Sequence, residues 1–163
     1  MERLHIRTAT LEDLEQIAAI EAACFPPAEA AGRASLAGRL DVYPGHFWLL
    51  EEGDQIVGFV NGMCTDAPYL ADAMYDDPTL HQEDGAWQMI FGVDTLPAYR
   101  RQGCAARLLE HVLAQARAQG RKGVVLTCKD RLVHYYAKFG FVNEGVSQST
   151  HGDVVWYQMR VTF

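Results

Sequence analysis

The stretch that decides the fold is FGVDTLPAYRRQGCAA, residues 91–106. It begins at the end of an apolar segment, Trp87 to Val93, that is typical of a buried strand. It ends in an amphipathic helix predicted over residues 103–119. Between the two lies a basic turn of small residues that leads directly into the helix. The first amides of a helix have no backbone partner and the helix dipole is positive there, so this turn is suited to bind an anion.

The backbone amides of residues 102–106 can together bind a pyrophosphate, and Gly103 lets the chain approach it closely. Such a string is weak evidence by itself, because many helices begin after glycine and arginine. The alternative is an ordinary helix start with two solvated arginines.

The rest of the chain predicts alternating strands and helices. Strands are predicted over residues 4–8, 46–51, 55–64, 87–93, 124–128, 141–145 and 154–161, and helices over residues 11–25, 28–40, 103–119 and 131–139. Thr10 and Asp13 predict a capping box at the first helix, and Glu52-Gly53-Asp54 predicts a hairpin turn. This order indicates one α/β or α+β domain, residues 1–163.

Residues 65–85 contain two prolines and five aspartates with little periodicity. A structureless loop of this length in a compact domain is usually functional or disordered. We therefore expect residues 65–85 to form a substrate lid.

Composition excludes several classes of protein. A formal net charge of -7 and a pI of about 5.3 argue against nucleic acid as a partner, because a phosphate backbone would be repelled. No apolar run has the length of a signal peptide core or a membrane span. The four cysteines lie far apart in apolar surroundings, Cys24, Cys64, Cys104 and Cys128. These features predict a cytoplasmic protein with buried, reduced thiols, no disulfide and no metal.

Two motifs resemble the GNAT superfamily of N-acetyltransferases. The family signature [RQ]-x-x-G-x-[GA] is matched by Arg100, Gly103 and Ala105. Downstream, LTCKDRLVHYYAKFGF, residues 126–141, is similar to the family's Y-x-x-x-G-F segment, and its likeness is greatest to the arylalkylamine (serotonin) N-acetyltransferase branch. The resemblance implies the GNAT fold, a mixed and mostly antiparallel sheet of about seven strands flanked by about four helices.

The resemblance also implies direct acetyl transfer from acetyl-CoA to a primary amine, which we expect to belong to a small molecule. The strand backbone at Phe91, Gly92 and Val93 would then pair with the pantetheine arm. The pyrophosphate would lie on the residues of the turn and helix start, Arg101, Gln102, Gly103, Cys104, Ala105 and Ala106. Tyr136 would protonate the departing thiolate; the alternative is that Tyr136, like Tyr135, is a core aromatic residue.

The chain departs from the arylalkylamine branch at the proton acceptor. That branch carries two histidines on the strand before the turn, where this chain has Trp87 and Met89, which cannot act as bases. Glu83, Asp84 and Asp66 are candidate acceptors, each with the alternative of a merely solvated carboxylate. His81 and His134 are further candidates.

Two other readings of the function stay open. The acceptor could be a protein N-terminus or lysine, or the chain could be a GNAT module that binds acetyl-CoA without turnover. We expect no nucleic acid or membrane as a partner, and the sequence leaves the assembly, a monomer or a homodimer, undecided.

Overall fold

The computed structural model describes residues 3–163, so the first two residues of the predicted 1–163 domain lie outside it. The described chain divides into two compact units, each built from two separate stretches. The first contains residues up to Asn61 and Gly92–Val112, and the second contains Gly62–Phe91 and Leu113–Phe163. The predicted class, a mixed α/β fold with mostly antiparallel strands, is confirmed.

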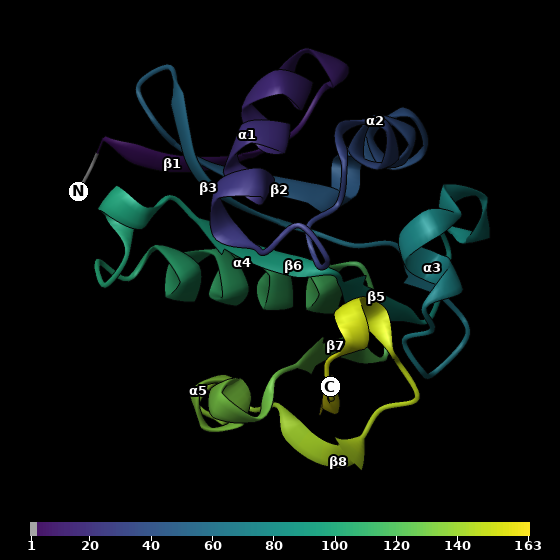
Figure 1. Cartoon of the computed structure of the whole chain (residues 1–163). Coiled ribbons are helices and arrows are strands. Elements are labelled where there is room, and N and C mark those ends of the chain that lie inside the picture. Colours follow the sequence, from purple (N-terminus) through teal and green to yellow (C-terminus); the bar gives the residue numbers. More distant parts are fainter. Residues whose placement is uncertain (1–2) are drawn as a thin grey trace. The chain divides into compact units, whose positions relative to one another are not determined.

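The first unit is a four-stranded antiparallel sheet in the order β1-β2-β3-β6. Its strands are β1 (Leu4–Thr8), β2 (Phe47–Glu52), β3 (Gln55–Asn61) and β6 (Gly92–Thr95). Helix α1 (Leu14–Cys24) packs against α2 (Arg33–Val42) and against β3 and β6 (Figure 1). The apolar sides meet in a core that includes Ile17, Leu36 and the stacked rings of Phe47 and Phe59, whose centroids lie 6.2 Å apart.

Local signals in the first unit are largely confirmed. The Thr10 amide donates to Asp13 Oδ2 at 2.8 Å, as the capping box predicts, and Gly53 in the hairpin turn has a φ of 59°. The second helix begins at Arg33 rather than residue 28. The amides of Glu29 and Ala30 both donate to the Pro26 carbonyl in a separate turn, so Gly32 precedes the helix instead.

The second unit is a five-stranded sheet in the order β4-β5-β7-β9-β8. Its strands are β4 (Cys64–Thr65), β5 (Trp87–Ile90), β7 (Gly123–Cys128), β8 (Val142–Val146) and β9 (Tyr157–Thr162). The pair β5 and β7 runs parallel, and the other pairs of this described sheet are antiparallel. Helix α5 (Val133–Ala137) packs on β8 and β9. Helix α4 (Cys104–Ala118) begins in the first unit and ends in the second.

The structure corrects two details of the predicted elements. The described chain has nine strands and five α-helices rather than about seven and four, because the strand predicted over residues 55–64 is divided into β3 and β4, the strand predicted over residues 87–93 is divided at Phe91, and an additional helix lies within residues 65–85. The residues before Phe91 form β5, which pairs with β4 and β7, and the residues after Phe91 form β6, which pairs with β3. Residues 65–85 are also not structureless: they contain α3 (Ala73–Asp76) and a 3-10 turn at Pro78–Leu80.

Three of the four cysteines are buried as expected, whereas Cys24 is partly exposed and its thiol donates to the Thr95 carbonyl. Within residues 3–163, no helix combines the length and apolar character needed to cross a membrane.

Candidate active site

The turn before α4 has an unusual backbone. Arg101 has a φ of 64° and Gly103 a φ of 80°, so two residues of the turn are left-handed. Two hydrogen bonds from side chains to the backbone stabilise the turn. Arg100 Nε donates to the Thr95 carbonyl at 3.2 Å, and Gln102 Nε2 donates to the Ala98 carbonyl at 3.1 Å. Left-handed geometry in a non-glycine residue costs free energy and persists where neighbouring contacts impose it. The turn therefore has the form of an anion-binding nest of backbone amides.

The surroundings of the turn fit a bulky phosphate group. Residues 101–103 are exposed, and a Cβ atom added to Gly103 would have no neighbour within 4 Å. Cys104 is buried behind them, and burial raises the pKa of its thiol, so the group stays neutral. The first i to i-4 hydrogen bond of helix α4 runs from the Arg107 amide to the Gly103 carbonyl. The amides before Arg107 can therefore donate to a ligand.

Strand β6 places two of the predicted cofactor contacts, Gly92 and Val93, at the border of a sheet. These residues pair with Asn61 and Val60 of β3, and β6 is the last strand of the order β1-β2-β3-β6. A terminal strand of a sheet offers backbone groups on one side to an extended ligand. This position fits the predicted pairing with a pantetheine arm. Phe91, the third predicted residue of this strand, belongs to the second unit.

Two carboxyl groups lie buried together beside this strand. Asp94 in β6 is fully buried and Glu21 in α1 is 6% exposed. Both oxygens of Asp94 and Oε1 of Glu21 are buried without a donor among the described residues. Burial and the adjacent Glu21 raise the pKa of Asp94 well above its ordinary value, so the protonated form of Asp94 is favoured. Glu21 Oε2 also accepts the Ala31 amide at 2.9 Å, which fastens the turn between α1 and α2.

Tyr136 lies in α5 of the second unit and is 8% exposed. Its ring meets Tyr135 at 5.3 Å and Phe141 at 6.0 Å, both edge to face. These contacts give Tyr136 a packing role, and a catalytic role for its hydroxyl stays a prediction.

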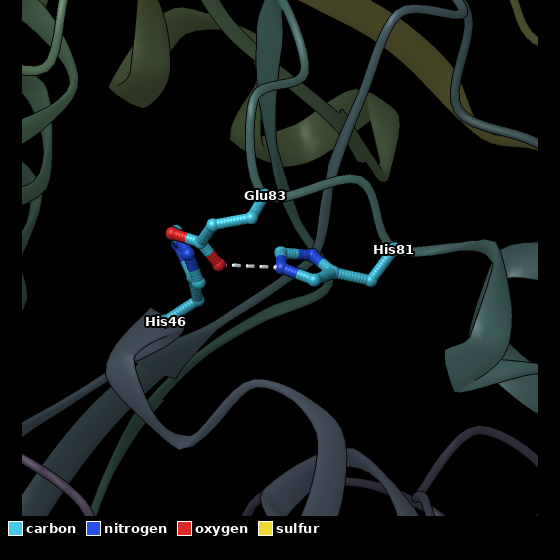
Figure 2. Close-up of side chains that lie close together, drawn as sticks. All are labelled: His46, His81 and Glu83. Atoms are coloured by element: carbon cyan, nitrogen blue, oxygen red, sulfur yellow. Dashed lines mark hydrogen bonds and ion pairs between the residues drawn. The ribbon is translucent and has the colours of Figure 1, made fainter.

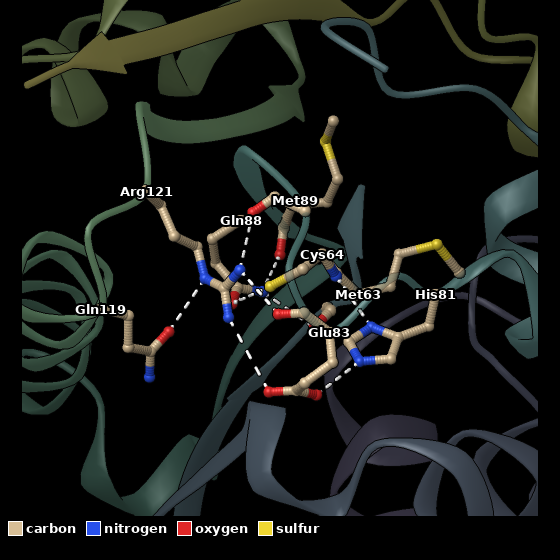
Figure 3. Close-up of polar contacts among 10 residues, drawn as sticks. Met63, Cys64, His81, Glu83, Gln88, Met89, Gln119 and Arg121 are labelled. Carbon is tan, nitrogen blue, oxygen red and sulfur yellow. Dashed lines mark hydrogen bonds and ion pairs between the residues drawn. The ribbon is translucent and has the colours of Figure 1, made fainter. Parts of the chain in front are cut away.

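The candidate proton acceptors on the segment before β5 are engaged in structural contacts. The Cys64 amide donates to His81 Nδ1 at 3.0 Å, and His81 Nε2 lies 2.8 Å from Glu83 Oε1 (Figure 2). Arg121 Nη1 donates to the carbonyls of Glu83 at 3.0 Å and Gly85 at 2.7 Å (Figure 3). These contacts anchor the end of the segment to the sheet.

The remaining candidates divide between anchored and exposed positions. Asp66 Oδ1 accepts the Ala86 amide at 3.0 Å, which closes the segment onto itself. Asp84 and His134 are exposed to solvent. Of the residues in place of the histidine pair, Met89 is fully buried and the Trp87 ring lies under the Arg160 guanidinium at 4.5 Å. None of these placements marks a base.

Sequence reasoning missed a cluster at the carboxyl ends of β5 and β7. The Tyr75 ring from α3 lies 4.8 Å from Phe91 and is stacked on His151 at 4.9 Å, with 9° between the ring planes. The Tyr75 hydroxyl is 3.3 Å from Thr127 Oγ1. No sequence signal could have predicted this cluster, because its members lie far apart in the chain and belong to no motif.

The second unit also contains a cavity of about 810 Å³. Its walls come from the segment Pro68–Asp72, from Trp87, and from residues of β8, β9 and the loop between them. Charged groups on the wall are Asp72, Glu144 and Arg160, and the last two are paired at 2.8 Å. The predicted lid segment thus lines a cavity large enough for a small molecule.

A left-handed turn at a helix start, preceded by the edge strand β6, has the form of a site for a phosphate-bearing ligand that lies along a strand. The chain matches the model of the acetyltransferase (GNAT) family over residues 14–141. It therefore belongs to the GNAT acetyltransferase family, whose activity is acyl transfer. The narrower likeness to the arylalkylamine branch is not confirmed. No curated protein sequence is significantly similar to this chain.

Several solved structures share the fold. The loading GNATL domain of CurA from Lyngbya majuscula has a TM-score of 0.85 at 20% identity, covering 98% of this chain and 97% of that one. The GphF GNAT-like decarboxylase in complex with isobutyryl-CoA has a TM-score of 0.83 at 25% identity, covering 97% and 98%. A GNAT family acetyltransferase from Brucella melitensis in complex with acetyl-CoA has a TM-score of 0.62 at 20% identity, covering 98% and 88%.

Proposed function

We propose that this protein is an N-acetyltransferase that transfers the acetyl group of acetyl-CoA directly to a primary amine of a small molecule. The observation that carries the proposal is the left-handed turn at Arg101 and Gly103 before α4, next to an edge strand, in a chain of the GNAT family. The 810 Å³ cavity in the second unit supports a small acceptor over a protein. That the protein is cytoplasmic and that it binds no metal both remain predictions from the sequence.

In this proposal the residues of the turn, Arg101 to Ala106, hold the pyrophosphate through backbone amides, and the β6 backbone at Gly92 and Val93 orients the pantetheine arm. A backbone N-H near Phe91 polarises the thioester carbonyl. The hydroxyl of Tyr136 donates a proton to the CoA sulfur as the C–S bond breaks.

A panel of aliphatic, aromatic and peptide N-terminal amines tests the function. Release of the CoA thiol from acetyl-CoA should depend on an amine, and mass spectrometry should find an acetamide. Turnover of small amines and not of peptides supports the small-molecule acceptor, and the reverse result would replace it with a protein N-terminus or lysine. Binding of acetyl-CoA without release with any amine would make the chain a non-catalytic module.

The role of Tyr136 can be separated from packing by Tyr136→Phe, which removes one oxygen and keeps the ring. We predict that kcat falls roughly 10²-fold or more while acetyl-CoA affinity stays constant, because a lost proton transfer affects the transition state alone. Tyr135→Phe is the matched control, since it makes the same change on the neighbouring ring. Turnover within about threefold of wild type would leave Tyr136 a packing residue, because a lost proton transfer should cost more than ~1 kcal/mol of barrier.

A second candidate function is decarboxylation of an acyl-CoA. It is favoured by the 25% identity to the GphF GNAT-like decarboxylase over nearly the whole of both chains. In this reaction an acyl-CoA with a carboxylate next to the thioester loses CO₂ and gains a proton at the same carbon. Incubation with malonyl-CoA and methylmalonyl-CoA without an amine, followed by mass spectrometry of the acyl-CoA, distinguishes the two functions.

A further inference from the structure

The cavity of about 810 Å³ in the second unit has more negative than positive groups on its wall. The charged wall residues are two carboxylates, Asp72 and Glu144, and one guanidinium, that of Arg160. A cavity whose wall has an excess of one sign of charge favours ligands of the opposite sign, because its low-dielectric walls concentrate the field. The wall therefore favours a positively charged ligand.

Arg160 and Glu144 satisfy each other on this wall. Arg160 Nε donates to Glu144 Oε2 at 2.8 Å and Arg160 Nη2 donates to Glu144 Oε1 at 3.0 Å, which is the bidentate geometry of a strong pair. Gln158 Nε2 also donates to Glu144 Oε1, at 2.7 Å. The hydrogen bonds from Arg160 lower the pKa of Glu144, so the pair stays ionised at neutral pH. The charges of this pair therefore compensate each other.

One donor of Arg160 points to the competing possibility of an anionic ligand. Nη1 of Arg160 is buried without a hydrogen-bond partner among the described residues. Because this atom is enclosed by protein, a ligand in the cavity reaches it only if the pair of Arg160 and Glu144 moves. An anion would also meet two carboxylates on the same wall. The wall therefore disfavours an anion.

Asp72 is the carboxylate of the wall whose hydrogen-bond donors are uncharged. Ser149 Oγ donates to Asp72 Oδ1, the Thr150 amide donates to Oδ2 at 3.0 Å, and Thr150 Oγ1 lies 3.5 Å from Oδ2. An ionised carboxylate has about four acceptor sites, so these three donors leave one for a ligand. Burial alone would raise the pKa of Asp72, but hydrogen bonds from Ser149 and Thr150 and the charge of His151 hold it below its ordinary value. Asp72 is thus ionised at neutral pH.

Other parts of the wall are apolar and accessible. Tyr69 and Val146 both line the cavity, and they are 66% and 67% exposed. Leu70 lies next to Tyr69, and its amide donates to Gln158 Oε1 at 3.1 Å, which fixes this part of the wall to β9. Covering exposed apolar side chains with an apolar group removes them from water and is favourable. A ligand that suits the whole wall therefore combines a positive charge with an apolar substituent.

Helix α3 connects Asp72 to the place where β5 ends. Asp72 directly precedes α3 with helical backbone angles, a φ of -57° and a ψ of -34°, and the Tyr75 amide donates to its carbonyl at 3.0 Å. Residues three positions apart in a helical turn are neighbours on its surface. The Tyr75 ring lies 4.8 Å from Phe91, near whose backbone the proposed function places the thioester carbonyl. The cavity wall is therefore one helical turn away from a residue that contacts Phe91.

We propose that the cavity is the acceptor site, in which Asp72 binds the ammonium group of the acceptor and Tyr69 and Val146 contact its apolar substituent. The proposal rests on the proposed function, N-acetyl transfer to a small molecule. It narrows the acceptor to a cationic amine with an apolar substituent, and it makes Asp72 the residue that selects the charge of the ligand.

Hexylamine, hexanol and hexanoate test the site, because they share an apolar chain and differ in the charge of the end group. Each is titrated into wild type with CoA present, so that binding is measured without turnover, and NMR follows the backbone amides. Hexylamine should bind at least about tenfold more tightly than hexanol, hexanoate should bind most weakly, and the shifted signals should belong to residues 68–72 and 144–149. Equal affinity for hexylamine and hexanol, tighter binding of hexanoate, or shifts confined to other amides would overturn the proposal.

The variant Asp72→Asn removes the charge and keeps an oxygen that accepts a hydrogen bond. Its affinity for hexylamine should fall about tenfold, and its affinity for hexanol should stay as in wild type, which shows that the cavity is intact. Asp76→Asn is the matched control, because Asp76 is exposed on α3 and is not part of the cavity wall. A preference for hexylamine that survives in Asp72→Asn refutes the proposal. If Asp72→Asn binds neither ligand, the comparison of the three ligands on wild type decides.

Turnover separates this proposal from the function on which it rests. With the best amine of the panel, Asp72→Asn should raise the KM for the amine about tenfold and leave kcat within about threefold, because the lost contact weakens binding of the ground state. An unchanged KM would refute the role of Asp72 and leave N-acetyl transfer intact. If wild type releases no CoA with any amine, N-acetyl transfer fails, whereas selective binding of hexylamine would still stand as a property of the cavity.

Discussion

The turn at residues 100–106 and the segment at residues 65–85 are ordered in different ways. The turn is defined by consecutive residues, a left-handed Arg101, a left-handed Gly103 and the start of α4. The segment is held by side chains from distant parts of the chain, among them Arg121 and Ser149. The difference shows that a site made of backbone amides is encoded locally, whereas a site made of side chains depends on contacts made only after folding.

The largest expected effect comes from replacing Arg121, because its side chain, which is 6% exposed, holds the end of the segment. Arg121→Leu removes two bonds from a charged donor to the carbonyls of Glu83 and Gly85. Each such bond contributes about 1.5–3 kcal/mol, so the free energy of unfolding should fall by about 3 kcal/mol or more. Denaturant titration measures this loss.

Hydrogen exchange locates the effect of Arg121→Leu. The amides of residues 82–86 should exchange faster, and those of the turn at residues 100–106 should not. Arg121→Lys is the control, because it keeps the charge and loses the planar fork. A change of less than about 1 kcal/mol would mean that the segment is ordered by other contacts.

A smaller effect is expected at the turn. Gly103→Val places a branched side chain at a φ of 80° and in the space of the phosphate, so acetyl-CoA affinity measured by calorimetry should fall at least about tenfold. Gly45→Val is the control, since Gly45 has open space around it without a left-handed φ. Equal affinity of Gly103→Val and wild type would place the phosphate site elsewhere.

The smallest effect separates backbone from side chain within the turn. Arg101→Gly relieves the left-handed strain and should raise the free energy of unfolding by about 0.5–1 kcal/mol relative to Arg101→Ala, which keeps the strain. Both variants lose the same exposed charge, so their acetyl-CoA affinities should fall equally and only a few-fold. Equal stability of the two variants in thermal unfolding would show that the turn carries no strain at Arg101.

The same division explains what the sequence could predict. Fold class, the hairpin at Gly53 and the glycine turn follow from residues that are neighbours in the chain. The change of strand partners at Phe91 does not follow from neighbouring residues. Apolar residues continue without interruption from β5 into β6, although the two strands belong to different sheets. Helix α3 was missed because four residues are too few to show a period.

The candidate site was predictable to a similar extent. The turn residues follow from a motif, and their geometry agrees with an anion site. The suggested proton acceptors were chosen by closeness in sequence to β5, and Asp66, His81 and Glu83 instead form backbone anchors. Asp72 had no motif around it, because its position depends on Ser149, which lies 77 positions away in the sequence.

The carboxyl pair of Asp94 and Glu21 makes folding of this chain a proton-binding reaction. With its pKa raised by burial and by Glu21, Asp94 keeps a proton in the folded chain that the unfolded chain releases above its ordinary value of 3.8. Stability from this group is therefore full below that value and is lost as the pH rises toward the raised pKa. Between the ordinary and the raised pKa of Asp94, unfolding releases this proton and acidifies a weakly buffered solution.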